Sequence, residues 1–147
     1  LLKKISRASK FNQGFATTEY LAASYLDLAW HTREEKVEDA NVFEKEILQN
    51  LGLIPEIASR YRSTYFAHIF AGGYSSGYYS YLWTEVLDAD AFELFKEKGL
   101  FDAETANNLK TLIYSSGNTR DLMDQYRKFR GSDPEIEPLL ERRGLVD

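Results

Sequence analysis

Hydrophobic residues recur along most of the chain every three or four positions, which is the spacing of one face of an α-helix. No stretch shows the strict alternation that is typical of a half-buried β-strand. Short polar runs, glycines and prolines interrupt the periodic segments. The pattern predicts an all-α protein, an irregular array of about six to seven helices, forming a single helical unit over residues 1–147.

Start and stop signals give the expected helix boundaries. Thr17 or Thr18 is expected to cap the second helix, and Gly52 and Gly99 are expected to end two later ones. The segment 60–70 is compatible with either a helix or an extended chain. The expected helices cover residues 1–9, 17–30, 39–51, 75–98 and 103–115, then one that begins at a Thr119 cap, and a last one from Ser132-Asp133-Pro134-Glu135 through Leu140.

Composition then narrows the class of protein. Hydrophobic residues make up 44% and charged residues 28% of the chain, as in a soluble globular protein. The net charge of −5 argues against a nucleic-acid partner, and the absence of a long apolar run argues against a membrane span. Cysteine is absent, so no disulfide or thiolate metal site is expected, and a cytoplasmic location is compatible with this.

The chain opens with Leu1-Leu2-Lys3-Lys4-Ile5, without an initiator methionine or a signal-peptide pattern. A basic amphipathic stretch that begins in mid-pattern resembles the tail of a longer helix. We therefore expect the chain to be a fragment whose missing upstream part is one of its partners.

No complete catalytic set is visible. The two histidines, His31 and His68, do not form a His-Glu-x-x-His pattern, and no three or four residues have the spacing of metal ligands on one helix face. Gly72-Gly73 lacks the lysine of a phosphate-binding loop, and no Gly-x-Ser-x-Gly elbow is present. No metal ligand is therefore predicted in this chain.

The segment from His68 to Tyr81 is the strongest candidate for a binding surface. Tyr74, Tyr78 and Tyr81 are four and three residues apart, which places them on one face if the segment is helical. Phenol groups have a pKa of about 10, so at neutral pH they can donate hydrogen bonds to an oxyanion. Two other interpretations stay open at this point: a tyrosine face in a core or interface, and a glycine pair in an ordinary turn.

The same segment closely resembles the signature that follows the zinc motif in the thimet oligopeptidase family, which includes oligopeptidase A and the bacterial peptidyl-dipeptidases. The likeness extends over nearly the whole chain. The residues that carry it are His68, Gly72-Gly73-Tyr74, Tyr78-Tyr79, Tyr81-Leu82-Trp83, Phe11-Asn12-Gln13-Gly14-Phe15-Ala16-Thr17-Thr18-Glu19-Tyr20-Leu21, Leu26-Asp27-Leu28-Ala29-Trp30-His31, Phe129-Arg130-Gly131 and Leu139-Leu140.

The resemblance implies a function and roles for individual residues. Family members are largely helical zinc peptidases that cut short peptides, and the chain would be the C-terminal part of a zincin-like catalytic domain. By position, Tyr81 and Tyr78 are the implied catalytic donors to the oxyanion. The implied substrate-binding residues are His68, Gly72, Gly73 and Tyr74.

The sequence departs from the family because the His-Glu-x-x-His helix and the third zinc ligand are missing. We therefore expect a parent metallopeptidase that uses zinc, and a fragment that binds no zinc and cleaves nothing. The rival interpretation is a stand-alone helical interaction module whose tyrosine face binds a partner protein. A His-Glu-x-x-His motif encoded upstream of Leu1 would favour the first, and a start codon just before Leu1 the second.

Overall fold

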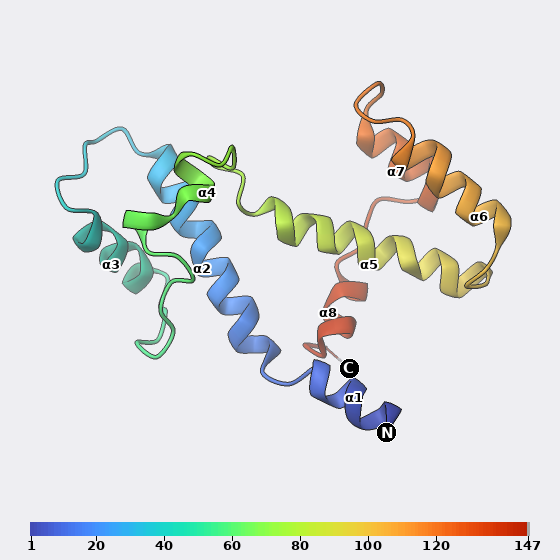
Figure 1. Cartoon of the computed structure of the whole chain (residues 1–147), viewed down its shortest axis with the longest axis horizontal. Helices are drawn as coiled ribbons and strands as arrows, with labels where there is room; N and C mark the ends of the chain where they lie inside the picture. The colour runs from blue at the N-terminus through green and yellow to red at the C-terminus, as the bar shows by residue number, and fades with distance from the viewer. Residues whose placement is uncertain (147) are drawn as a thin grey trace. The chain divides into compact units, whose positions relative to one another are not determined.

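The computed structural model describes residues 1–146, and all regular structure in this range is helical, which confirms the all-α prediction (Figure 1). Contacts divide the chain into two compact units, one from Leu1 to Tyr81 and the other beginning at Leu82. The helices are α1 (Leu2–Ser9), α2 (Gln13–Thr32), α3 (Ala40–Asn50), α4 (Ala67–Phe70), α5 (Ser80–Lys98), α6 (Ala103–Asn108), α7 (Leu122–Arg130) and α8 (Glu137–Arg143), with a 3-10 turn η1 (Ser63–Tyr65) and a π-helical segment η2 (Leu109–Tyr114).

In the first unit, α2 is the central helix, and it contacts α3, while α3 contacts η1. Small residues on α2 let aromatic side chains approach it closely, and the buried core cluster consists of Ala23, Phe66, Ile69 and Tyr78. The ambiguous stretch before Gly72 forms η1 and the short helix α4, which supply Phe66 and Ile69 to this core. Ile69 and Tyr78 of this core belong to the segment from His68 to Tyr81, the candidate binding surface.

The first residues of α2 and α5 differ from those predicted. α2 begins at Gln13 rather than at Thr17 or Thr18, because Asn12 adopts a left-handed conformation (φ 57°) that turns the chain directly into the helix. α5 begins at Ser80 rather than at Ser75 or Ser76, because residues 74–79 form turns. Ser76 has a φ of 55°, which a helix does not allow.

Two predicted caps are also wrong. Thr119 donates its hydroxyl to the carbonyl of Ser116 at 2.6 Å, and Asp121 caps α7 instead by accepting from the amide of Asp124 at 2.8 Å. Asp133 caps no helix because its carboxylate accepts from Nε of Arg127 at 2.6 Å. The last helix therefore starts later than predicted, at Glu137.

In the second unit, α8 packs against α5 through Val86, Ala89 and Leu139. Ion pairs flank this contact: Arg142 lies 2.7 Å from Asp88, and Arg143 lies 2.6 Å from Glu85. The pair of Arg142 with Asp88 is exposed on both sides, and such a pair contributes at most about 1 kcal/mol.

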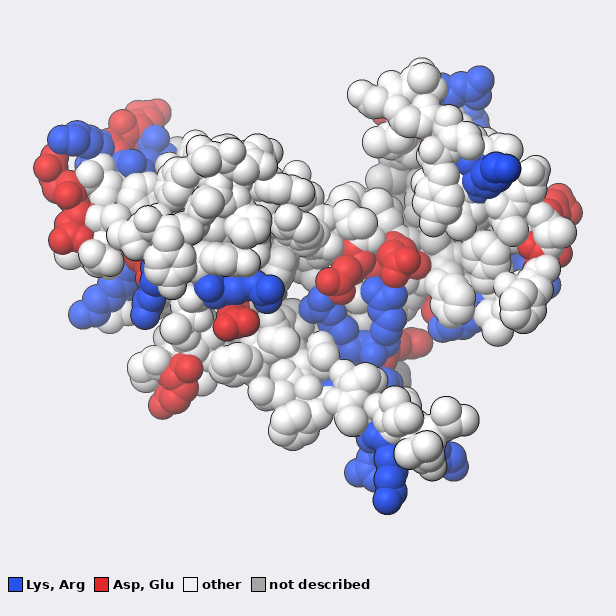
Figure 2. Space-filling model, viewed as in Figure 1, with Lys and Arg blue, Asp and Glu red and all other residues white. Residues whose placement is uncertain are grey.

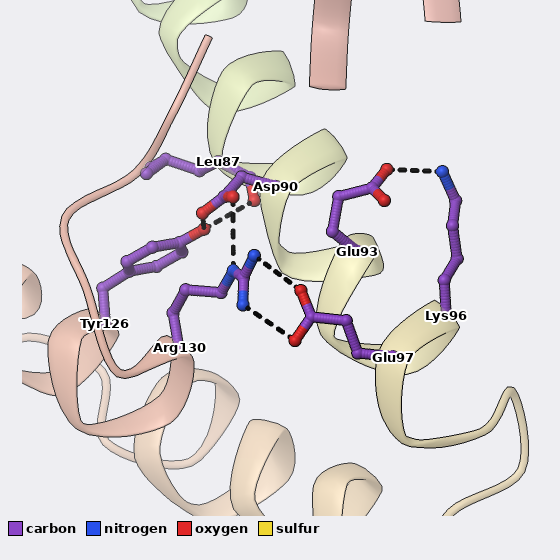
Figure 3. Close-up of polar contacts among 7 residues, drawn as sticks. All are labelled: Leu87, Asp90, Glu93, Lys96, Glu97, Tyr126 and Arg130. Atoms are coloured by element: carbon purple, nitrogen blue, oxygen red, sulfur yellow. Dashed lines mark hydrogen bonds and ion pairs between the residues drawn. The ribbon is translucent and has the colours of Figure 1, made fainter. Parts of the chain in front are cut away.

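A buried polar network joins α5 to α7 in the same unit (Figure 3). Asp90 is 1% exposed, and its carboxylate accepts from the hydroxyl of Tyr126 at 2.6 Å and from Nε of Arg130 at 3.2 Å. Arg130 also pairs with Glu97 through both terminal nitrogens, at 3.1 and 3.5 Å. Burial, together with the hydrogen bond to Asp90, raises the pKa of Tyr126, so its hydroxyl stays a donor. The network satisfies a carboxylate that would be costly to bury alone.

Acidic and basic side chains are interspersed over much of the face shown in Figure 2, with uncharged surface between them. Among residues 1–146, no helix combines the length and the apolar character that crossing a bilayer requires.

Candidate functional site: the tyrosine loop

The segment from His68 to Tyr81, here called the tyrosine loop, runs from α4 through a series of turns into the first residues of α5 (Figure 1). The prediction that Tyr74, Tyr78 and Tyr81 share one helix face is wrong, because only Tyr81 lies in a helix. The turns nevertheless bring the rings together. The centroids of Tyr74 and Tyr81 stack at 5.1 Å, and those of Tyr78 and Tyr81 are 5.3 Å apart.

The two glycines after α4 are required by the path of the backbone. A Cβ atom on Gly72 would lie 2.9 Å from both the Cα and the carbonyl oxygen of His68, closer than such atoms can approach. Gly73 has a φ of 80°, in the region that favours glycine. The amide of Tyr74 then donates to the carbonyl of His68 at 3.1 Å and closes the turn.

Gly72→Ala is expected to destabilise the protein by about 1–3 kcal/mol, because rigid backbone would have to move away from the new methyl group. Gly14→Ala is the matched control, since a Cβ atom there meets nothing within 4 Å. Within α2 that change should be neutral or stabilising by up to about 1 kcal/mol. Urea unfolding followed by circular dichroism measures both. Equal stability of the two variants would contradict the close backbone approach at Gly72.

Tyr78 is the most deeply placed of the three tyrosines, at 4% exposed. Its ring packs on Phe66 at 4.9 Å and stacks on Tyr20 at 5.4 Å, and its backbone carbonyl accepts a hydrogen bond from the hydroxyl of Tyr20. Burial raises the pKa of Tyr78, and the positive charge of Arg60 opposes that rise. The ring thus belongs to the core of the first unit.

Tyr81 is 39% exposed, and its neighbour Tyr74 is half-buried. A hydrogen bond with the phenol of Tyr74 is the main reason why the pKa of Tyr81 is raised, to about 12. Since the phenol is neutral below its pKa, Tyr81 remains a protonated donor throughout the neutral range. The stacked pair therefore presents a polar, uncharged surface to solvent.

His68 lies beside this pair and completes the aromatic group. Its ring centroid is 4.8 Å from that of Tyr61, 5.9 Å from Tyr78 and 6.4 Å from Tyr74. The structure thus brings together all the aromatic residues that the sequence proposed for the site, with the Gly72-Gly73 turn joining His68 to Tyr74.

Sequence reasoning missed the part played by Asp27 of α2. This residue is fully buried, and its carboxylate accepts from the amides of Ser76 at 3.0 Å and Tyr78 at 2.9 Å. A signal was present: position 27 lies four residues after Ala23 and three before Trp30, so it shares their buried face. A carboxylate on such a face requires hydrogen-bond partners.

A metal site needs several convergent ligands, and within residues 1–146 no three His, Asp or Glu side chains are grouped in a way that could hold an ion. The residues described here thus do not fit the zinc that the resemblance implies.

Known proteins place this chain in a family. A dipeptidyl carboxypeptidase of Escherichia coli K12 is 45% identical over 149 residues, and oligopeptidase A of the same organism is 35% identical over 147 residues. A probable cytosolic oligopeptidase A of Arabidopsis thaliana is 35% identical over 150 residues. These alignments cover 98–99% of the chain but only 21–22% of each relative, so the chain spans about a fifth of their length.

The model of peptidase family M3 matches residues 1–145. The chain therefore belongs to peptidase family M3, which confirms the family assigned from the His68–Tyr81 motif and its flanks. The membership argues against the rival interpretation of a stand-alone interaction module.

Proposed function

We propose that this chain forms the substrate-contacting wall of a zinc peptidase that cleaves short peptides. The observation that carries the proposal is the stack of the exposed Tyr81 on the half-buried Tyr74, beside His68, in a chain of peptidase family M3. Relatives that share the chain almost from end to end are named dipeptidyl carboxypeptidase and oligopeptidase A, and both names describe hydrolysis of peptides.

The proposed roles follow from exposure and chemistry. Tyr81 donates a hydrogen bond from its phenol to the oxyanion that forms when the scissile carbonyl becomes tetrahedral, because it is exposed and remains protonated at neutral pH. Tyr78 is the second donor that the family resemblance implies; since it is only 4% exposed, it is proposed to act chiefly by packing against Tyr81 and fixing that ring. A donor held in place before reaction stabilises the developing charge without having to reorganise.

The remaining residues of the loop are proposed to bind the substrate. His68 and Tyr74 offer polar atoms on either side of the Gly72-Gly73 turn. Gly72 and Gly73 carry no side chain that would keep a peptide away from the backbone, and both are exposed. Exposed backbone of this kind can pair with an extended peptide.

The zinc of the proposed enzyme has no ligand set among residues 1–146, so none of these roles depends on a metal ligand in this chain. The zinc ligands would lie in a part of the enzyme that corresponds to the segments of the M3 relatives outside their alignment with this chain.

The isolated 147-residue chain is expected to bind no stoichiometric zinc and to cleave no peptide, because it contributes only one wall of the proposed site. Elemental analysis of the purified, zinc-treated chain and a quenched fluorescent peptide assay test this. The full-length enzyme, assayed in parallel, is the positive control. One zinc ion per isolated chain together with peptide cleavage would overturn the proposed division of labour.

A further inference from the structure

We propose that Asp27 is a positioning residue for the tyrosine loop: it holds the backbone of residues 76–78 so that Tyr78 and Tyr81 keep the geometry that turnover requires. The inference rests on the proposed function, and it goes further by assigning a role to a residue on a different helix, α2, which itself contacts no substrate in the proposal.

The geometry of the Asp27 carboxylate supports this role. Each oxygen accepts one backbone amide of the loop, Oδ1 from Ser76 at 3.0 Å and Oδ2 from Tyr78 at 2.9 Å. Nδ1 of His31 lies 2.9 Å from Oδ1 and 2.9 Å from the backbone oxygen of Asp27. Both atoms are acceptors, so Nδ1 carries the hydrogen, and His31 fixes the orientation of the carboxylate from the next turn of α2.

The amides that Asp27 binds lie where the loop most needs support. Ser76 adopts a left-handed conformation with a φ of 55°, which is unfavourable for a residue other than glycine. Its amide donates to Oδ1 of Asp27 and so helps to hold this conformation. A charge-assisted hydrogen bond inside the protein is strong enough to offset such strain.

Two residues of α2 hold the backbone of Tyr78. Its amide donates to Asp27, and its carbonyl accepts from the hydroxyl of Tyr20. The ring of Tyr78 then contacts Tyr81, and Tyr81 stacks on Tyr74. A continuous series of contacts therefore runs from the buried carboxylate to the exposed phenol, all within the first unit.

Asp90 provides a matched control for Asp27. It is equally buried, at 1% against 0% exposed, and it also sits on a long helix, but its partners are the side chains of Tyr126 and Arg130 in the second unit. Substitution of either aspartate by asparagine removes a buried charge and turns one acceptor into a donor. Only the change at position 27 disturbs the amides of the tyrosine loop.

The test uses the full-length enzyme with Asp27→Asn, Asp90→Asn, Tyr81→Phe and the double variant Asp27→Asn/Tyr81→Phe. Asp27→Asn should lower kcat by about 10- to 100-fold and change KM by less than about threefold, because misplaced donors affect mainly the transition state. Hydrogen exchange should accelerate in peptides that cover residues 69–82 and not elsewhere. Asp90→Asn should accelerate exchange in α5 and α7 and leave kcat within about threefold of wild type.

The double variant separates positioning from general stability. If Asp27 acts through Tyr81, the kcat of the double variant should be within about threefold of the kcat of the Tyr81→Phe variant. A full multiplication of the two losses, or unchanged exchange in residues 69–82, would overturn the proposal. If Tyr81→Phe alone keeps wild-type turnover, the proposed function fails, and hydrogen exchange still decides whether Asp27 holds the loop.

A second pair of variants covers the case in which Asp27→Asn does not fold. His31→Ala removes the Nδ1 donor, whereas His31→Asn keeps a nitrogen donor at about the same distance from the backbone. Exchange in residues 69–82 should accelerate with the alanine variant and return toward wild type with asparagine. Equal exchange in both would contradict the inference.

Discussion

Tyr81→Phe in the full-length enzyme should lower kcat by about a hundred- to a thousandfold while KM changes by less than about threefold. The change removes the phenol hydroxyl and leaves the ring in place. Its hydrogen bond is proposed to form with the oxyanion and not with the ground-state carbonyl, so the loss falls on turnover. Steady-state kinetics with a short peptide substrate gives both constants.

Tyr79→Phe is the control for this change. Tyr79 is the tyrosine immediately before Tyr81 in the sequence and is 52% exposed. The ring contacts of Tyr81 with Tyr74 and Tyr78 do not involve it. The Tyr79→Phe enzyme should retain kcat within about twofold, since no contact of the Tyr79 phenol with the oxyanion or the substrate is proposed. A Tyr81→Phe enzyme as active as the Tyr79→Phe enzyme would remove Tyr81 from the chemistry.

Arg130→Ala should lower the free energy of unfolding by about 3–5 kcal/mol. The change leaves the Asp90 carboxylate buried with the hydroxyl of Tyr126 as its remaining side-chain donor, and an uncompensated buried charge is costly. Urea unfolding monitored by circular dichroism measures the loss.

Arg127→Ala is the comparison for Arg130→Ala. Arg127 lies on the same helix, and its side chain is 48% exposed against 14% for Arg130. It pairs with Asp124 and Asp133, which are themselves exposed, so its removal should cost no more than about 1 kcal/mol. Similar losses for the two variants would show that the Asp90 network is not the anchor between α5 and α7.

The sequence predicted the fold class and the grouping of the site aromatics, and each success has a physical reason. Helical periodicity depends on neighbours three and four residues away, so it survives without knowledge of the tertiary structure. The family motif grouped His68, Tyr74, Tyr78 and Tyr81, and in the structure each of these rings has its centroid 5.1–6.4 Å from that of another of the four.

The details that the sequence could not supply depend on long-range contacts. The partner that holds residues 74–79 in turns, Asp27, lies 49 residues before Ser76, so local spacing could not identify it. Helical spacing predicted that the three tyrosines share one helix face, whereas in the structure turns bring their rings together. The cap predicted at Asp133 failed in a similar way, since Arg127 engages its carboxylate. Predictions from local sequence were wrong where a residue distant in sequence, or a competing side chain, determined the backbone conformation or the cap.

The most direct test of the substrate-wall proposal is a crystal structure of the full-length enzyme with a phosphinic peptide, whose tetrahedral phosphorus mimics the reacting carbonyl. The proposal predicts the hydroxyl of Tyr81 at about 2.5–3.0 Å from a phosphinate oxygen, as for a charge-assisted hydrogen bond, with His68 and Tyr74 against the peptide. A bound peptide that leaves Tyr81 facing solvent, with no contact to the tyrosine loop, would contradict it.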